Sequence, residues 1–454
     1  MNVSIVGTGY VGLTTGACLA FLGHNVTCID ADESKIASLE AGKIPFHEPF
    51  LAELVHETRP NLKFTTSYVD SIPHSQVTFI AVGTPPGVNG APDLKYLESA
   101  ARGIGEQLTG EFMVVVNKST VPIGSGHWVA SIVGEAYQKK TGKNGEGQFA
   151  VASNPEFLRE GSAIFDSLYP DRVVVGTDRQ RTAEVLYSLY RPLLEQDFRP
   201  PSFLPRPDRM GAVPLISTDV SSAELIKYAA NAFLALKISY INEIGQLAGR
   251  VGADIEQVAR GIGLDARIGH RFLQSGIGWG GSCFGKDTAA LVSTAAEYGL
   301  DSPIVKAART VNLRQRERVV EILLDELKIL KGRTVSLLGL AFKANTDDLR
   351  EAPALDIAKK LMERGARVKA HDPVAMERFQ KENPSFGITC CATPEEAIAG
   401  SDATVLVTEW PQYLELDWDA LRPKMRAPVI LDGRNYLDRP RLTKAGFRVL
   451  GLAG

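Results

Sequence analysis

The sequence predicts an α/β protein with two doubly wound parallel sheets joined by a long central helix. A short apolar strand, Val3–Val6, leads into the glycine fingerprint Gly7-Thr8-Gly9-Tyr10-Val11-Gly12. A strand before and a helix after such a fingerprint are the setting of a Rossmann-like dinucleotide-binding domain. A helical pattern without internal proline then covers residues 219–250. A second alternation of strands and helices starts at residue 331, which indicates a second Rossmann-like domain.

The first expected domain, residues 1–218, alternates short apolar strands with helical segments. Such alternation favours a parallel sheet with helices on both faces. Residues 141–148 are polar and glycine-rich, and residues 198–214 are rich in Pro and Arg, so both are expected to be loops. The pattern predicts strands at 3–6, 24–29, 77–82, 112–116, 149–152 and 172–175, and helices at 10–22, 94–108 and 127–137.

Residues 219–330 are expected to form a central helical domain. At 1.5 Å per residue, a helix over 219–250 would span roughly 45 Å, enough to bridge two domains. The last expected domain, residues 331–454, lacks an intact glycine fingerprint, so it is expected to bind a different part of the ligand. Helices are predicted at 255–262, 289–298, 304–330 and 354–364, and strands at 334–338, 368–370, 404–407 and 429–431.

Charge and composition argue against several classes of protein. The 454 residues carry 50 Lys and Arg against 53 Asp and Glu with no basic block, which disfavours a nucleic-acid-binding protein. No apolar run approaches the roughly 18 to 20 residues that cross a bilayer. The first six residues lack the basic region of a signal peptide. Five cysteines without paired metal-ligand spacing fit a reducing compartment, so we expect a cytoplasmic protein without a metal.

One cysteine lies in a glycine-rich turn, Gly280-Gly281-Ser282-Cys283-Phe284-Gly285-Lys286-Asp287. A cysteine nucleophile reacts as the thiolate, and a neighbouring ammonium or helix N-terminus favours that form. The glycines allow the backbone to approach a ligand closely. The other four cysteines are expected to be buried structural residues. Together with a dinucleotide site, Cys283 suggests oxidation of an aldehyde through a covalent thioester.

The glycine fingerprint predicts NAD rather than NADP. Asp30 follows the second strand, about twenty residues after the fingerprint, where a carboxylate can bind a ribose diol and would repel a 2′-phosphate. The backbone N–H groups at the helix start are expected to meet the pyrophosphate. The alternative is a glycine turn that only packs a helix on a strand. The expected cofactor contacts of this turn are Gly7, Gly9, Tyr10, Val11 and Gly12.

Four other features are ambiguous by themselves. The segments 82–86 and 118–122 each follow an apolar strand, so they lie either at a ligand-binding sheet edge or in plain turns. The segment 154–161 offers charged groups that fit a site or a solvated turn. Lys227 and Asn231, four residues apart, share one face of the expected long helix. They are either edge residues of that face or groups aimed at an oxyanion.

In order along the chain, these segments resemble the UDP-glucose/GDP-mannose dehydrogenase family. The resemblance rests on GTGYVGL, VGTPP, KSTVP, NPEFLREG, ELIKYAANAFLALKISYINE, RIGHRFLQSGIGWGGSCFGKD, LGLAFKANTDDLRE and DGRN. It runs from residue 1 to beyond residue 430. It implies two Rossmann-like domains joined by a long helix, and NAD-dependent four-electron oxidation of a nucleotide sugar, with UDP-glucose as the expected substrate. It also implies a homodimer or a higher homo-oligomer.

The same resemblance implies roles for individual residues. Cys283 resembles the catalytic nucleophile, and Lys227, Asn231 and Asp287 resemble groups for oxyanion stabilisation and proton transfer. Thr120 and Glu156 resemble the pair that positions and activates water. Arg267 resembles an arginine donated to a neighbouring subunit. Further NAD contacts are implied for Lys35, Thr84, Thr120, Glu160, Lys286 and Arg350, and further substrate contacts for Phe157, Leu158, Arg159, Phe272, Leu273, Gln274, Ser275, Gly276, Gly280, Lys343 and Arg434.

Two positions depart from the family pattern: Gly285 stands where a proline is common, and Trp279 where Tyr or Phe is common. Phe284 favours UDP-glucose as the substrate. Other members of the family act on GDP-mannose or a UDP-N-acetylhexosamine by the same chemistry. A remote alternative is an NAD-binding regulator without enzymatic activity.

Overall fold

The computed structural model describes residues 1–85, 87 and 90–453. The chain divides into two compact units. Unit 1 comprises Met1–Ala229 and Ala289–Tyr298, and unit 2 comprises Ala230–Thr288 and Gly299–Gly454. Two helices, α8 (Val220–Val251) and α10 (Phe284–Glu297), belong in part to each unit. The division into three domains with boundaries after residues 218 and 330 remains a prediction.

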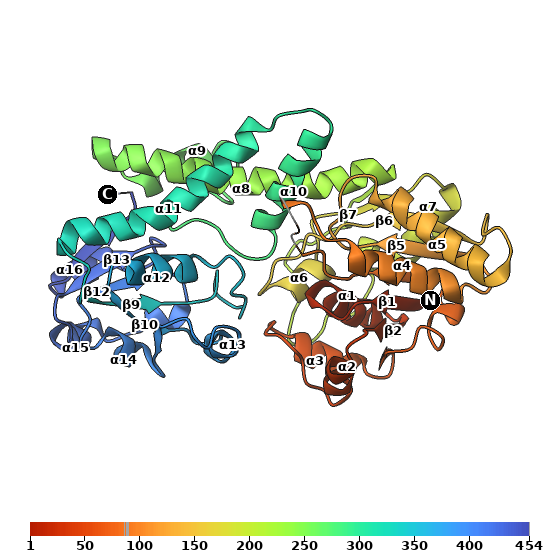
Figure 1. Cartoon of the computed structure of the whole chain (residues 1–454), viewed down its shortest axis with the longest axis horizontal. Coiled ribbons are helices and arrows are strands. Elements are labelled where there is room, and N and C mark those ends of the chain that lie inside the picture. Colours follow the sequence, from red (N-terminus) through yellow and green to blue (C-terminus); the bar gives the residue numbers. More distant parts are fainter. Residues whose placement is uncertain (86, 88–89, 454) are drawn as a thin grey trace. The chain divides into compact units, whose positions relative to one another are not determined.

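Unit 1 is built on an eight-stranded sheet in the order β3-β2-β1-β4-β5-β6-β7-β8 (Figure 1). All neighbouring strands are parallel except β6 and β7, which run antiparallel. Its strands are β1 (Asn2–Val6), β2 (Asn25–Ile29), β3 (Leu62–Thr65), β4 (Val77–Ile80), β5 (Met113–Asn117), β6 (Phe149–Ser153), β7 (Val173–Gly176) and β8 (Leu215–Thr218). Its other helices are α1 (Tyr10–Phe21), α2 (Glu33–Glu40), α3 (Leu51–Thr58), α4 (Lys95–Gln107), α5 (Ser125–Thr141), α6 (Ala163–Leu168) and α7 (Gln180–Glu195).

Unit 2 is built on a six-stranded parallel sheet in the order β11-β10-β9-β12-β13-β14. Its strands are β9 (Thr334–Leu338), β10 (Arg367–His371), β11 (Thr389–Cys390), β12 (Ala403–Leu406), β13 (Val429–Asp432) and β14 (Arg448–Gly451). Its other helices are α9 (Ile255–Gly263), α11 (Pro303–Leu327), α12 (Pro353–Glu363), α13 (Met376–Glu382), α14 (Pro394–Ile398), α15 (Trp418–Leu421) and α16 (Arg439–Lys444). The predicted fold class, two parallel-sheet α/β domains with a long helix between them, is confirmed.

Each sheet has a core on both faces, which explains the apolar runs that predicted the strands. In β5, Val114 and Val116 enter one core cluster of unit 1, whereas Met113 and Val115 enter another. Alternate side chains of a strand point to opposite faces, so a strand covered on both sides must be apolar throughout. At roughly 25 cal/mol per Å², burial of these side chains is the main favourable term for each unit.

Both sheets begin with the same glycine turn. Gly7 follows β1 with φ +102°, and Gly339 follows β9 with φ +101°. A Cβ would lie 2.6 Å from the carbonyl oxygen of Ala81 at the first position and 2.3 Å from the Thr408 side chain at the second. Only glycine satisfies both the left-handed backbone and the close approach at these two turns.

The Pro- and Arg-rich segment 198–214 is a loop, as expected, and it packs on the core of unit 1. The Phe198 ring contacts Phe21 and Tyr169, with centroids 6.2 and 6.1 Å apart. Arg206 Nη2 donates to the Phe198 carbonyl at 2.6 Å, and Tyr169 donates to the Leu204 carbonyl at 3.0 Å. These contacts fix the segment on α1 and α6. Among the described residues, no helix is both long enough and apolar enough to cross a membrane.

Candidate active site

The glycine turn of unit 1 can receive a dinucleotide. A Cβ at Gly12 would lie 1.9 Å from the Gly7 carbonyl oxygen, so glycine lets α1 start tightly against the turn. Apart from its chain neighbours, no atom of the described residues lies within 4 Å of the position that a Cβ would take at Gly9, which leaves the helix start open on that side. Backbone N–H groups at such a helix start favour a pyrophosphate. The residues present therefore fit the expected NAD.

Asp30 lies at the end of β2 beside this turn. Its Oδ2 accepts hydrogen bonds from the Thr8 N–H at 2.8 Å, the Thr8 hydroxyl at 2.6 Å and Lys35 Nζ at 3.0 Å. Burial opposes ionisation, but these donors hold the pKa of Asp30 below its usual value. The sequence placed Asp30 and Lys35 at the cofactor independently, and the structure brings them into one ion pair. A carboxylate that is ionised at neutral pH fits a ribose diol.

Two other residues with implied cofactor roles meet at neighbouring strand ends. Thr84 follows β4, Thr120 follows β5, and the Thr84 hydroxyl donates to the Thr120 carbonyl at 2.8 Å. Because the carboxyl ends of parallel strands share one sheet edge, the two loops converge as expected. Pro86 of the same loop lies outside the described residues.

Tyr10 is joined to Glu48, a residue that sequence reasoning missed. The Tyr10 hydroxyl donates to a Glu48 carboxylate oxygen. The same carboxylate accepts the N–H of Gly161 at 2.6 Å and of Ala163 at 2.7 Å. Burial and the Glu48 charge raise the pKa of Tyr10. Burial among apolar neighbours could have suggested Glu48, but its partner Gly161 is 113 residues away.

Glu156 and Lys227 form a buried ion pair in unit 1. Lys227 Nζ lies 2.7 Å from both Oε1 and the backbone oxygen of Glu156, and the two side chains are 4% and 6% exposed. The other carboxylate oxygen of Glu156 accepts the Leu158 N–H at 2.6 Å. Burial opposes ionisation of Glu156, but Lys227 and the Leu158 N–H hold its pKa below the usual value. Glu156 is therefore a carboxylate with both oxygens engaged.

The residues after Glu156 are held by cations. The Arg172 guanidinium lies 3.7 Å from the Phe157 ring centroid, and Lys227 Nζ lies 5.6 Å from it. Arg159, expected at the substrate, donates to Asp166 through Nε at 3.0 Å and Nη2 at 2.6 Å. Leu158 and Glu160 are half-buried in the same segment. Arg172, just before β7, was missed because α6 and a turn separate it from this segment in the sequence, so no local pattern links the two.

Unit 2 carries the cysteine at the start of α10. The Cys283 carbonyl accepts the Asp287 N–H at 2.8 Å, which places the thiol at the N-terminal end of the helix. Asp287 Oδ2 accepts the Asn231 amide at 2.6 Å, and its Oδ1 lies 2.9 Å from Lys286 Nζ. The structure thus brings Asn231 and Asp287 together from two helices, with Cys283 one helical turn before Asp287. Lys286, expected at the cofactor, is paired with Asp287.

The glycines around Cys283 make room for a neighbouring segment. A Cβ at Gly280 would lie 2.4 Å from the Glu351 carbonyl oxygen, and one at Gly285 would lie 1.8 Å from the Glu351 carboxylate. Glycine at position 285 is thus explained, since the Glu351 carboxylate occupies the space of a side chain there. The preceding Trp279 is fixed by its N–H to Asn312 Oδ1 at 2.7 Å and its indole N–H to Ser239 at 3.2 Å.

Other expected substrate residues line the loop before Trp279. The Gly276 N–H donates to Asn242 Oδ1 at 2.7 Å, and Ser275 and Leu273 are buried. Phe272 has φ +65°, a left-handed backbone that is uncommon outside glycine. Its ring lies 6.3 Å from Phe284. Gln274 is exposed.

Arginines and a lysine complete the set in unit 2. Arg434 donates to three carbonyls, of Val407 at 2.7 Å, Gly278 at 3.0 Å and Phe342 at 3.1 Å. Arg350 pairs with Asp348 at 2.8 Å. Lys343 Nζ lies 5.5 Å from the Phe342 ring centroid. Arg267 has a side chain that is 89% exposed and pairs with Asp265 at 2.6 Å.

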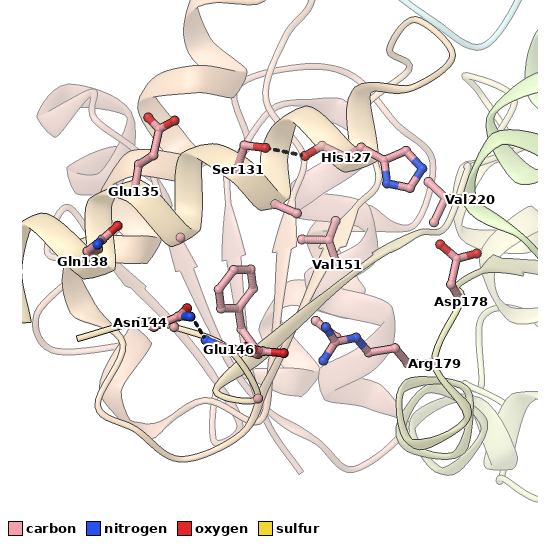
Figure 2. A pocket seen from close by; sticks show the side chains of 17 residues that line it. His127, Ser131, Glu135, Gln138, Asn144, Glu146, Val151, Asp178, Arg179 and Val220 are labelled. Atoms are coloured by element: carbon pink, nitrogen blue, oxygen red, sulfur yellow. Dashed lines mark hydrogen bonds between the residues drawn. The ribbon is translucent and has the colours of Figure 1, made fainter.

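A separate cavity of about 450 Å³ lies in unit 1 (Figure 2). It is lined by α5, β6 and the start of α8, with His127, Ser131, Asp178, Arg179 and Val220 around it. None of the residues predicted for the site lines it. Within residues 1–85, 87 and 90–453 there is no cluster of three His, Cys, Asp or Glu side chains able to hold a metal ion.

A dinucleotide turn in one unit and a helix-start cysteine with polar partners in the other are typical of an NAD-dependent dehydrogenase. Comparison with known proteins agrees with this class. The chain belongs to the UDP-glucose/GDP-mannose dehydrogenase family. Its NAD binding domain matches residues 1–194, its central domain residues 221–314 and its UDP binding domain residues 336–439.

Individual relatives match over nearly the full length. The UDP-glucose 6-dehydrogenase TuaD of Bacillus subtilis is 44% identical over 451 residues, which cover 98% of this chain and 92% of the relative. The UDP-glucose 6-dehydrogenase of Rhizobium meliloti is 43% identical over 454 residues, 99% of this chain and 98% of the relative. A solved UDP-glucose dehydrogenase from the archaeon Pyrobaculum islandicum has a TM-score of 0.88 and 38% identity, covering 100% of this chain and 97% of that one. The resemblance inferred from sequence, and NAD as cofactor, are confirmed.

Proposed function

We propose that this protein oxidises UDP-glucose to UDP-glucuronate, with two NAD⁺ reduced to two NADH. The observation that carries the proposal is Cys283 at the N-terminal end of α10, one helical turn before Asp287, whose carboxylate accepts the Asn231 amide. A thiol at a helix start is suited to act as a nucleophile, and an amide and a carboxylate beside it can handle an oxyanion and a proton. The full-length similarity to UDP-glucose 6-dehydrogenases supports the choice of substrate.

NAD⁺, when bound at the glycine turn, would accept a hydride from the substrate in each of two oxidations. In the first oxidation the primary alcohol loses a proton and a hydride and becomes an aldehyde. The Cys283 thiolate then adds to the aldehyde carbon and forms a thiohemiacetal. Loss of the second hydride gives a thioester. Water adds to the thioester carbon, the carbon–sulfur bond breaks, and the carboxylate and the thiol are released.

The chain's own residues divide these tasks. Asn231, with Lys227, is proposed to stabilise the oxyanion, and Asp287 to take part in the proton transfers. Glu156 is proposed to activate the hydrolytic water, which Thr120 helps to position. Because both Glu156 oxygens are engaged, water must replace one of its present partners before Glu156 can accept a proton. Asp30 and Lys35 are proposed to bind the ribose of the cofactor.

The test is the formation of NADH from a panel of nucleotide sugars. UDP-glucose should yield two NADH per molecule consumed, and GDP-mannose and UDP-N-acetylhexosamines far less. Cys283→Ala should abolish the second oxidation. Preference for another sugar of the panel would overturn UDP-glucose as the substrate, and NADH formation from none of them would overturn the enzymatic function.

We further propose that the protein acts as a homodimer, in which α8 meets a second copy. Within unit 2, Phe233, Tyr240, Leu247 and Val251 are each more than half exposed. The first three are spaced by seven residues, which is the spacing of a seam between packed helices. Exposed apolar stripes of this kind mark interaction surfaces. The cytoplasmic location also remains a prediction.

A further inference from the structure

Lys118 is a buried ammonium that the functional assignments do not use. It follows β5 in the segment 118–122, and only 9% of the residue is exposed. Its Nζ donates to Asn154 Oδ1 at 2.9 Å and lies 5.9 Å from the Phe79 ring centroid. A buried charge is costly unless it is compensated, and burial lowers the pKa of Lys118 to about 8. The cost of burying this ammonium suggests that Lys118 has a function.

The partner of Lys118 fixes the start of the Glu156 segment. Asn154 Oδ1 also accepts the Tyr190 hydroxyl at 2.6 Å. The Asn154 amide donates to the Val174 carbonyl at 2.7 Å, and its backbone N–H donates to the Asn117 carbonyl at 2.9 Å. Asn154 is therefore held from β5, from β7 and from α7. It stands two residues before Glu156, so its position fixes where that carboxylate can lie.

The charges around Glu156 in unit 1 are unequal. Lys227 contacts it from α8, and the charge of Lys118, held on Asn154 at the end of β5, also lowers its pKa, so two ammonium groups favour one carboxylate. Cys18 from α1 and Tyr190 from α7 also face Lys118, and burial raises the pKa of both, so they stay neutral at ordinary pH. Among the described residues, the charged groups that act on Lys118 are the Glu156 carboxylate, which favours its ammonium form, and Lys227, which disfavours it.

We propose that Lys118 is a positioning residue for Glu156, which clamps Asn154 and supplies a second buried positive charge that keeps the Glu156 carboxylate ionised. The inference rests on the proposed function, in which Glu156 activates the hydrolytic water. Lys118 touches neither substrate nor water in this scheme. It acts through Asn154 and through its charge.

Two variants separate the charge from the hydrogen bond. Lys118→Met removes the charge and keeps the length and apolar stem of the side chain. Tyr190→Phe removes a hydrogen bond to the same oxygen of Asn154 and changes no charge at neutral pH. Replacement of a buried charge by an apolar side chain of similar size is often neutral or stabilising, so Lys118→Met is expected to fold. Thermal melting of both variants checks this.

The measurement is turnover of UDP-glucose between about pH 4 and pH 9, a range that includes the titration of a glutamate with a lowered pKa. Loss of the positive charge makes ionisation of Glu156 harder, so the acid limb of the Lys118→Met profile should move to higher pH. On the acid limb, below the pH at which Glu156 is fully ionised, we expect turnover about three- to tenfold below the wild type, as for the loss of one charge interaction of roughly 1 kcal/mol, and convergence at higher pH, where Glu156 is ionised in both proteins. Tyr190→Phe should lower turnover by a factor that does not change with pH.

An unmoved acid limb in a folded Lys118→Met variant would overturn the proposal. So would an equal movement in Tyr190→Phe, because the hydrogen bond alone would then account for the effect. Failure of the proposed function appears differently, as wild-type protein that forms no NADH from UDP-glucose at any pH.

Discussion

At the scale of one residue, the Glu156 carboxylate has to be ionised and also has to be basic enough to accept a proton, and these two requirements conflict. Lys227 and the Leu158 N–H stabilise its ionised form, which a general base needs. The same partners hold its pKa low, which makes it a weaker base, and they cover both oxygens. Substrate or water must therefore take over part of the Lys227 contact during the reaction.

Glu156→Gln should stall the enzyme after both oxidations. Glutamine keeps the shape and the acceptor for the Leu158 N–H, but it cannot accept a proton from water. Turnover should fall by about 10²- to 10⁴-fold, the usual range for loss of a general base, or roughly 3 to 5 kcal/mol of barrier. Rapid mixing with UDP-glucose and NAD⁺ should give a burst approaching two NADH per site, and intact-protein mass measurement should find a sugar-nucleotide adduct.

The control for this experiment is Glu156→Gln combined with Cys283→Ala, in which the adduct should vanish. Slow steady turnover with no burst and no adduct would show that Glu156 acts before the thioester forms, and its proposed role would be wrong.

Phe157 offers a second prediction at the residue scale. Because the Arg172 guanidinium lies on its ring at 3.7 Å, Arg172→Met and Phe157→Leu should disrupt the same contact. A cation–π contact is worth roughly 0.5 to 2 kcal/mol, so each change should lower kcat/KM by about 2- to 30-fold. The double variant should lose about as much kcat/KM as the more impaired of the two single variants, and not the product of the two losses. If the two losses multiply, Arg172 does not act through Phe157.

At the scale of elements, Glu224 joins the first turn of α8 to the start of α5. Its carboxylate accepts the Gly124 and Gly126 N–H groups at 2.6 and 2.9 Å. Burial raises its pKa to about 7, although both N–H groups act the other way. An acid with a raised folded-state pKa stabilises the fold fully below its unfolded value near 4.5 and loses that contribution as pH rises through about 7.

Glu224→Gln should remove this pH dependence. The window from 4.5 to about 7 corresponds to roughly 3 kcal/mol at most. The melting temperature of the variant, relative to that of the wild type, should therefore rise as pH increases from 5 to 8. Glu243→Gln on the exposed side of α8 controls for the loss of one acidic side chain. An unchanged difference between Glu224→Gln and the wild type across this range would contradict the assignment.

An element could be predicted from the sequence when its own residues carry the pattern that defines it. Strands such as β1 and β5 are buried on both faces, so their apolar runs identified them. The reversed direction of β7 beside β6 has no counterpart in the local pattern, since a strand has the same apolar run in either direction. Helix α10 starts at Phe284, five residues before its expected start, because its first turn is the glycine-rich Cys283 segment.

The same limit applies to the candidate site. Asp30 and Cys283 are marked by their neighbours in sequence, and the structure gives both a fitting environment. Glu48 and Lys118 depend on partners 113 and 36 residues away, so no local pattern could assign them. Gly285 departs from the family pattern for a reason that lies in Glu351, 66 positions along the chain.

At the scale of the whole molecule, each of the two sheets has an aspartate after its second strand, and the two aspartates have different environments. Asp30 follows β2, and Asp372 follows β10, at matching places after the second strand of each unit. Asp372 is 2% exposed and accepts the Leu340 and Ala341 N–H groups at 2.7 and 3.0 Å, which closes its own glycine turn. Asp30 keeps partial exposure. This difference explains physically why only the first glycine turn is suited to a dinucleotide ribose.

Arg267 bears on the assembly of whole chains. Its side chain is 89% exposed and pairs with Asp265, while Lys237 Nζ holds the loop through the Ile268 carbonyl at 3.0 Å. An exposed arginine on a fixed loop is well placed to reach a second copy. If it serves the partner's substrate, Arg267→Ala and Cys283→Ser should each be inactive alone but should complement each other when mixed.

The activity recovered on mixing the two variants can be calculated. Random exchange in a dimer makes about half of the molecules hybrids, and each hybrid has one site with both Cys283 and the partner-donated arginine, so about a quarter of wild-type activity should return. Mixing Cys283→Ser with Asp287→Asn is the matched control, because both defects lie in one cluster of the same unit, and it should restore nothing. Subunit exchange is followed by mass with one variant tagged. No recovery in hybrids shown to have formed would mean that Arg267 serves its own chain, and the shared site would be wrong.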